Sequence, residues 1–189
     1  FVSRIKSVCE EKIKSIGINI NTEKTNVILG EKCSILYGDE YITDILCGVK
    51  VRLSPLSFYQ VNRATAEKLY KKAAEYAAPA GKTVLDLYCG AGTIGLSMAE
   101  KSKKIIGVEI VPQAVEDARF NARLNGITNA EFMCSDAVGA AAELAKKGVK
   151  PDVIIVDPPR KGCSAELIST IAEDFKPEKV VYVSCDPAT

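Results

Sequence analysis

Five side chains that could do chemistry stand where short apolar runs of the sequence end. In chain order they are Asp86, Glu109, Asp136, Asp157 and Cys185. A carboxylate can hold a cation or accept hydrogen bonds from hydroxyl groups, and a thiolate can attack an electron-poor carbon atom. The sequence contains no histidine, so a catalytic thiol would have to be activated without an imidazole.

The apolar runs predict the strands that position these side chains, because from residue 83 onward they alternate with helical patterns. The predicted strands are 83–88, 104–109, 130–134, 152–157 and 179–184, and the predicted helices are 93–101, 112–125, 136–147 and 164–174. This alternation is typical of an α/β fold, a Rossmann-like doubly wound sheet that is mainly parallel and has helices on both faces. Ligands bind such sheets beyond the C-terminal strand ends, so we expect the five side chains to meet in one crevice.

The first third of the chain has a different pattern. Apolar spacing predicts a helix over residues 1–17, ending at its glycine, and glycine-punctuated runs predict short strands within residues 26–54. A further helix is predicted to begin at an Asn62 cap and to end at Pro79 and Gly81. A small β-rich segment is therefore expected to precede the α/β part.

Composition and cysteine usage narrow the class of protein. The 189 residues are 47% hydrophobic and 26% charged with a net charge of +1, so any RNA-binding surface would have to be a local patch. Seven cysteines without a C-x-x-C pair predict reduced thiols in a cytoplasmic protein, and neither a disulfide framework nor a metal site. No apolar run reaches membrane-spanning length. The chain begins without methionine, so we expect a fragment of a longer protein.

The segment LDLYCGAGTIG is suited to a nucleotide-like cofactor. Gly90, Gly92 and Gly95 satisfy the pattern G-x-G-x-x-G, and Glu109 follows at a distance suited to ribose hydroxyl groups. A dinucleotide would place an anionic pyrophosphate near the carboxylate of Asp86, whereas S-adenosylmethionine carries a cationic sulfonium and an ammonium group. The segment therefore resembles class I methyltransferases, with an NAD-binding oxidoreductase or a glycine turn without a ligand as alternatives.

Two further segments are expected to face the substrate. Asp157 is followed by Pro158 and Pro159, as in many base-modifying methyltransferases, although a solvated acid in a strand-ending turn is an equal alternative. Cys185 is followed by Asp-Pro, a turn signal whose backbone N–H groups can favour a thiolate; a buried structural cysteine is the alternative. Together the two segments predict a target site beside the cofactor.

Five motifs carry a specific resemblance to a known family. They are SFYQVN (57–62), LDLYCGAGTIG (85–95), GVEIVPQAVEDARFNARLNGI (107–127), VDPPRKG (156–162) and VYVSCDPAT (181–189). In this order and spacing they resemble the RNA uracil-C5 methyltransferases, whose bacterial members make 5-methyluridine in 23S ribosomal RNA or in the tRNA T-loop. The resemblance implies that residues 1–56 end a central helix- and β-rich domain. Residues 57–189 would form a truncated S-adenosylmethionine-binding methyltransferase domain.

The resemblance also implies roles for single residues. Cys185 is implied to be the nucleophile that adds to C6 of uracil, while Cys89 and Cys163 match no catalytic position. From the resemblance, the residues expected to hold S-adenosylmethionine are Gln60, Tyr88, Glu109 and Asp157. Asp136 and Thr93 match weaker positions of the family. The glycine-loop pattern adds Asp86, Gly90 and Gly92.

The same resemblance implies a chain that is truncated at both ends. The family's proton-abstracting glutamate, its last two strands and its small N-terminal RNA-binding barrel have no counterpart here, so we expect the fragment to be inactive. Residues 180–184 would then form an exposed apolar edge through which the chain could self-associate. The expected partner is RNA, with 23S ribosomal RNA favoured over tRNA. A cytosine-C5 or guanine-N2 RNA methyltransferase and a non-catalytic RNA-binding module are the alternatives.

Overall fold

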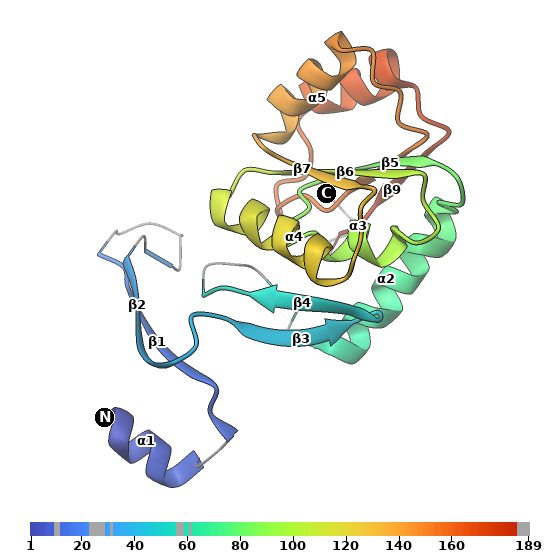
Figure 1. Cartoon of the computed structure of the whole chain (residues 1–189). Helices are drawn as coiled ribbons and strands as arrows, with labels where there is room; N and C mark the ends of the chain where they lie inside the picture. The colour runs from blue at the N-terminus through green and yellow to red at the C-terminus, as the bar shows by residue number, and fades with distance from the viewer. Residues whose placement is uncertain (10–11, 23–28, 31, 56–58, 61, 185–189) are drawn as a thin grey trace.

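The computed structural model describes residues 1–9, 12–22, 29–30, 32–55, 59–60 and 62–184. A five-stranded sheet with helices on both faces forms the main body, and an N-terminal helix and hairpin extend away from it (Figure 1). This is the predicted fold class, an α/β sheet preceded by a small β-rich segment. Within the described residues, no helix is long and apolar enough to cross a membrane.

The five strands of the central sheet run parallel in the order β7-β6-β5-β8-β9. They are β5 (Thr83–Leu87), β6 (Lys104–Glu109), β7 (Ala130–Cys134), β8 (Val153–Val156) and β9 (Lys179–Tyr182). The chain moves outward from β5 through β6 and β7, and then returns to pair β8 with the other edge of β5. Each predicted strand is confirmed, although β5, β8 and β9 end one or two residues earlier than predicted. The reversal beside β5 is the switch point at which such sheets bind ligands.

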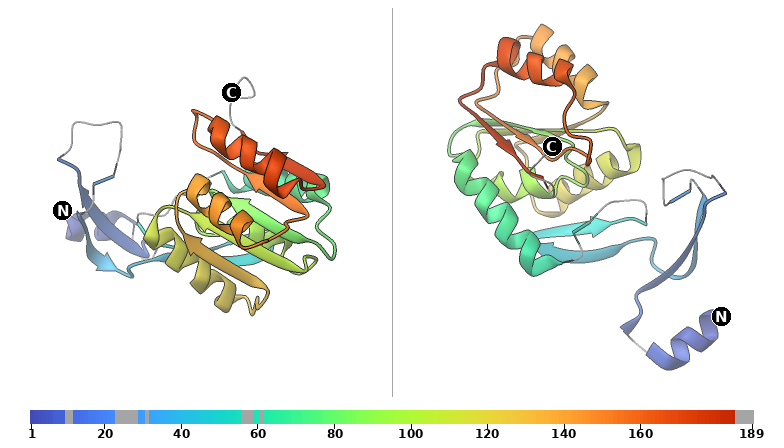
Figure 2. Two further views of the ribbon diagram at one scale, coloured as in Figure 1. Left: turned by 90° about the horizontal axis from the view of Figure 1, so that it is seen from above. Right: turned by 180° about the vertical axis from the view of Figure 1, so that it is seen from behind.

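Helices cover both faces of the sheet (Figure 2). Alternating side chains of the strands pack against the helices on opposite faces. Val84 of β5 faces one helical layer, and Leu85 and Leu87 face the other. The first layer consists of α2 (Arg63–Ala77), α3 (Thr93–Met98) and α4 (Pro112–Leu124), and the second of α5 (Ala137–Lys146), α6 (Ala165–Ser169) and the π-helix η2 (Thr170–Phe175). The two layers exclude water from both faces, as the continuously apolar strands predicted.

The hairpin of β3 (Ile42–Leu46) and β4 (Val49–Leu53) packs on the α2–α4 side of the sheet. Its buried apolar side chains join the core cluster that contains Val84 of β5. Hairpin and sheet therefore share one hydrophobic core. The predicted domain boundary falls within residues 56–58, outside the described residues, and the division into two domains stays a prediction.

The N-terminal elements differ from their prediction. They are α1 (Val2–Cys9), β1 (Ser15–Ile20) and β2 (Lys32–Gly38). A single helix over residues 1–17 is wrong, because the isoleucines from residue 16 onward recur at every second position and suit a strand. Gly17, expected to end the helix, instead lies at a shift in the register between β1 and β2. The strand predicted at residues 26–30 falls largely outside the described residues.

The strand β9 lies at one end of the sheet, where the self-association surface was predicted. Val181 and Val183 are buried, whereas Val180 and Tyr182 are 49% and 43% exposed. Apolar side chains of this strand therefore alternate between the core and the surface. Self-association through residues 180–184 stays a prediction.

Candidate functional site

The chain turns sharply after β5, and three residues of the turn have left-handed backbone conformations. Tyr88, Gly90 and Gly92 have φ angles of 65°, 54° and 80°. Glycine adopts this conformation without strain, but tyrosine rarely does. Strained residues of this kind are held by their surroundings and cluster at ligand-binding sites. The predicted cofactor loop is thus a defined, partly strained structure.

Glu109, the last residue of β6, is tied to this loop by a backbone hydrogen bond. Its Oε2 accepts the N–H of Gly90 at 3.0 Å, and its Oε1 accepts the N–H of Val111 at 2.9 Å. The carboxylate is therefore fixed in direction, and each oxygen keeps lone-pair capacity for another donor. The predicted contact with ribose hydroxyl groups is compatible with this geometry and stays a prediction.

A cavity of about 460 Å³ opens beside Glu109. Tyr88 and Asp136 also line it, so the structure brings three of the predicted site residues together. Asp136 is fixed as the cap of α5, since its Oδ1 accepts the N–H of Gly139 at 2.8 Å. Sequence reasoning misses Ile110, which adds an apolar wall to the cavity. The signal for it is an apolar residue directly after an acid that ends a strand.

Asp86 does not face this cavity, contrary to the expectation that the strand-end carboxylates meet in one crevice. It precedes the end of β5, so strand alternation turns it to the same face as Val84, where it is fully buried. Its Oδ2 accepts the N–H of Gly95 at 2.9 Å, and its Oδ1 has no hydrogen-bond partner among the described residues. Burial above all, and then the charges of Asp157 and Glu109, raise the pKa of Asp86 to about 7.

Asp157 and Thr93 belong to the part of the site nearer α2 and β8. The N–H of Asp157 donates to the C=O of Leu87 at 3.4 Å, and partial burial of its carboxyl group raises its pKa. The hydroxyl of Thr93, the first residue of α3, lies 3.0 Å from that of Tyr70 in α2. Burial raises the pKa of Tyr70 to about 12, so this side chain is a neutral phenol. Sequence reasoning misses Tyr70, whose signal is a tyrosine in the buried stripe of an amphipathic helix.

Two predicted residues are less fully defined. Gln60 is half-buried ahead of α2. Cys185 lies outside the described residues, so its role as the nucleophile stays a prediction. The chain leading to it runs along β8, because the N–H of Val183 donates to the C=O of Val156 at 2.8 Å. Residue 184 is therefore carried toward the segment that begins with Asp157.

Two thiols of neighbouring loops, Cys89 and Cys163, are poorly suited to nucleophilic chemistry. Burial raises the pKa of Cys163, and it raises the pKa of Cys89 well above the ordinary value. A raised pKa lowers the fraction of reactive thiolate, as expected for packing or loop thiols. In the described part of the chain, no group of three or more histidine, cysteine or acidic side chains is placed to hold a metal ion.

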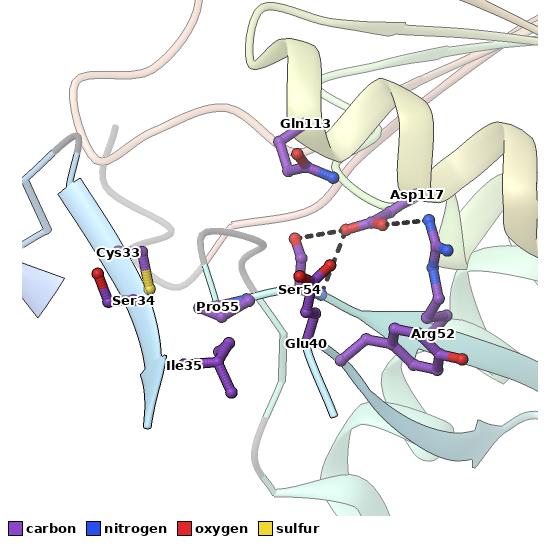
Figure 3. A pocket seen from close by; sticks show the side chains of 10 residues that line it. Cys33, Ser34, Ile35, Glu40, Arg52, Ser54, Pro55, Gln113 and Asp117 are labelled. Atoms are coloured by element: carbon purple, nitrogen blue, oxygen red, sulfur yellow. Dashed lines mark hydrogen bonds and ion pairs between the residues drawn. The ribbon is translucent and has the colours of Figure 1, made fainter. Parts of the chain in front are cut away.

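A second cavity of about 530 Å³ lies between β2, β4 and α4 (Figure 3). Polar groups on its wall bond one another: the buried carboxylate of Asp117 accepts from the guanidinium group of Arg52 at 3.0 Å and from the hydroxyl of Ser54 at 2.6 Å. Arg52 also lies over the ring of Phe120, 3.7 Å from its centroid. The described residues that line this cavity include none of the predicted site residues. We interpret the bonds of Asp117 with Arg52 and Ser54 as contacts that hold the β3–β4 hairpin on α4.

The amino-acid sequence matches known RNA methyltransferases over nearly its whole length. A family model described as tRNA (uracil-5-)-methyltransferase matches residues 11–189. A Bacillus cereus (strain ATCC 14579) protein described as an uncharacterized RNA methyltransferase is 51% identical over 191 residues, which cover 97% of this chain and 42% of the relative. A counterpart from Halalkalibacterium halodurans is 50% identical over 178 residues, covering 94% of this chain and 39% of the relative.

The fold also matches a solved structure. The tRNA (uracil-54, C5)-methyltransferase of Pyrococcus abyssi, in complex with S-adenosyl-L-homocysteine, superimposes with a TM-score of 0.75 at 33% identity. The match covers 92% of this chain and 42% of that enzyme. The chain thus spans about two fifths of the length of the proteins it matches.

Proposed function

The chain belongs to the tRNA (uracil-5-)-methyltransferase family, and from this premise we propose that it binds S-adenosylmethionine in the cavity beside Glu109. The whole protein would then transfer a methyl group to C5 of a uridine in RNA. One observation supports this proposal above the others. The strained loop after β5 is bonded through Gly90 to Glu109, at a cavity that Tyr88 and Asp136 also line.

The residues present fit this cofactor in two respects. Glu109 and Asp136 carry acceptor oxygens at a cavity with apolar walls, which suits a nucleoside with ribose hydroxyl groups and an amino group. Asp86 has a buried oxygen beneath the loop without a hydrogen-bond partner in the described part of the chain. A nearby cation would stabilise its ionised form, whereas an anionic pyrophosphate would oppose it. The remaining proposed contacts are Gln60, Thr93 and Asp157.

Covalent catalysis by Cys185 is the proposed role of this chain in the chemistry. When bound, S-adenosylmethionine supplies the electrophilic methyl group that C5 accepts. Uracil C5 is a weak nucleophile, so the Cys185 thiolate first forms a bond from Sγ to C6, and the electron pair of the C5=C6 bond moves into an enolate. After C5 has been methylated, a base in the longer protein removes the C5 proton. The C5=C6 bond then re-forms and Sγ leaves as a thiolate.

The proposed substrate is a uridine extruded from its RNA stack, because C6 must face a thiol while C5 faces the methyl donor. We place 23S ribosomal RNA first. The Pyrococcus abyssi neighbour, named for tRNA, makes tRNA the alternative. A cytoplasmic location and self-association through residues 180–184 belong to the proposal as well.

Calorimetry of this chain with S-adenosylhomocysteine tests the cofactor assignment. We expect saturable binding with one molecule per chain. Absence of binding by the folded chain would contradict the assignment.

Covalent trapping in the longer protein tests the nucleophile. RNA that carries 5-fluorouridine should accumulate as an adduct, because fluorine at C5 cannot leave as a proton does. Cys185→Ala should abolish both trapping and methylation, whereas the matched control Cys163→Ala should leave both nearly intact. A trapped peptide containing Cys163 would overturn the role of Cys185. Parallel 23S and tRNA transcripts decide between the two substrates.

A further inference from the structure

Two asparagines four residues apart, Asn121 in α4 and Asn125 at its C-cap, hold the edge of β4 that faces them. Asn125 accepts the N–H of Lys50 at 2.8 Å and donates to the C=O of Lys50 at 2.7 Å. Asn121 holds Arg52 in the same way, at 2.7 and 3.3 Å. Lys50 and Arg52 are two residues apart, so their backbone groups point to the same edge of the strand. The two amide side chains thus act in place of a neighbouring strand.

Asn121 makes one further contact that reaches the proposed cofactor loop. Its Nδ2 also donates to the C=O of Ala91 at 3.2 Å, whereas the Nδ2 of Asn125 donates instead to the C=O of Asn121 at 2.7 Å. Asn121 is fully buried, and Ala91 is 2% exposed. Ala91 lies between the two left-handed glycines of the loop. One amide therefore bonds both the hairpin and the loop.

This contact fixes the orientation of one peptide unit in the loop. The C=O of Ala91 accepts from Asn121, while the N–H of Gly92 in the same unit donates to the C=O of Cys89 at 2.8 Å. Because a peptide unit is planar, bonds at both of its ends prevent it from turning. Removal of the Asn121 amide takes this donor from a buried carbonyl, which favours rotation of the unit toward another partner.

We propose that Asn121 is a positioning residue that couples the cofactor loop to the docked β3–β4 hairpin. The inference rests on the proposed function, since it concerns the affinity of the same loop for the cofactor. A loop held in its binding conformation gives up less conformational freedom when a ligand binds. By linkage, a bound ligand must in turn stabilise the contact between Asn121 and the hairpin.

The docking of the hairpin does not depend on Asn121 alone. Arg52 is also paired with the buried carboxylate of Asp117 (Figure 3), and Lys50 is held by Asn125. Replacement of Asn121 should therefore leave the hairpin in place while releasing Ala91. This separates the positioning role from a general loss of structure.

The test compares Asn121→Leu with its matched control Asn125→Leu, since leucine keeps the branched shape of the side chain and removes both of its hydrogen-bonding groups. Each variant is titrated with S-adenosylhomocysteine well below its melting temperature, so that the folded protein is measured. We expect the Kd to rise at least about fivefold for Asn121→Leu, the lower range of a typical coupling, and to stay within about twofold for Asn125→Leu. Equal effects of the two variants would overturn the proposal.

Amide hydrogen exchange of the unmodified chain gives a second readout that needs no variant. The N–H of Arg52 is bonded to Asn121, and the N–H of Lys50 is bonded to Asn125. Saturation with S-adenosylhomocysteine should slow exchange at Arg52 more than at Lys50, again by about fivefold. Equal protection of both amides contradicts the coupling. If the unmodified chain does not bind S-adenosylhomocysteine at all, the proposed function fails, and that outcome is distinct from equal behaviour of the two asparagines.

Discussion

The two sides of the central strand β5 hold carboxylates in opposite environments. Toward β6, Glu109 and Asp136 accept backbone N–H groups and line an open cavity. Beneath the loop, Asp86 is fully buried, and one of its oxygens has no hydrogen-bond partner among the residues that the structure describes; Asp157, at the end of β8, is half-buried. Burial raises the pKa of Asp86 and of Asp157. In the sequence, all four appear as equivalent acids at strand ends.

The position of each acid relative to its strand end explains the difference. Glu109 is the last residue of β6, so its carboxylate can turn back to the loop amides. Asp86 is one residue short of the end of β5, so it points into the layer that contains α3. The first kind of carboxylate is a fixed acceptor for neutral donors. The second kind is destabilised in its ionised form, and a nearby cation would stabilise that form.

The largest expected effect concerns Asp86. Its pKa is about 7 in the folded chain and 3.8 in an ordinary environment, so the folded state binds more protons between these values. Stability therefore falls as the pH rises from about 4 to about 7, by about 4 kcal/mol at about 1.36 kcal/mol per pH unit. Asp86→Asn removes this dependence. The variant should be more stable than the unmodified chain at pH 8, with a difference that shrinks toward pH 5, as measured by urea unfolding.

Asp152→Asn is the control for this pH series. Asp152 accepts the N–H of Thr83 at 2.7 Å, at the opposite end of β5, and is only half-buried. Its replacement should bring no gain in stability at pH 8. The Asp86→Asn variant should also bind S-adenosylmethionine more weakly, because a buried negative charge that favours a nearby cation is lost. If the stability difference between Asp86→Asn and the unmodified chain did not change with pH, the pKa of Asp86 would not be raised by burial.

The next effect concerns Glu109, which lines the open cavity. A hydrogen bond to a charged group contributes about 1.5–3 kcal/mol, so Glu109→Ala should weaken binding of S-adenosylhomocysteine at least about tenfold. The control is Glu131→Ala in β7, whose carboxylate pairs with Lys104 at the surface, 2.8 Å away. Calorimetry should show no change in Kd for the control. Unchanged affinity of Glu109→Ala would remove Glu109 from the site.

The layers of the fold and the residues of the cavity beside Glu109 could be predicted because local sequence patterns determine them. Apolar runs alternating with helices predicted five parallel strands, and the glycine spacing predicted the loop that contains Gly90 and Gly92. Tyr88, Glu109 and Asp136 could be placed together because the carboxyl ends of parallel strands meet at one edge. These inferences need only sequence periodicity and strand direction.

Other features depend on contacts between distant segments. The first residues of β1, 15–17, were predicted as the end of a helix because the helical spacing of residues 2–13 was extended too far, and the pairing of β1 with β2 shows that they belong to a strand. The bonds from Asn121 and Asn125 to β4 join residues about seventy positions apart, and amide side chains on a helix usually indicate no more than a polar surface. The burial of Asp86 follows from one residue of strand register. No local sequence pattern predicts these contacts.

The smallest expected effect concerns Asp136, whose carboxylate caps α5 as well as lining the cavity. Loss of a cap lowers the free energy of unfolding by about 1 kcal/mol, so Asp136→Ala should be destabilised by this amount and should also bind S-adenosylhomocysteine a few times more weakly. Asn62→Ala is the matched control, because Asn62 caps α2 by accepting the N–H of Thr65 at 3.2 Å and does not line the cavity. Urea unfolding should show similar losses for the two variants, while calorimetry should show weaker binding for Asp136→Ala alone. Equal affinity of the two variants would reduce Asp136 to a helix cap and leave Glu109 as the acid that serves the cavity.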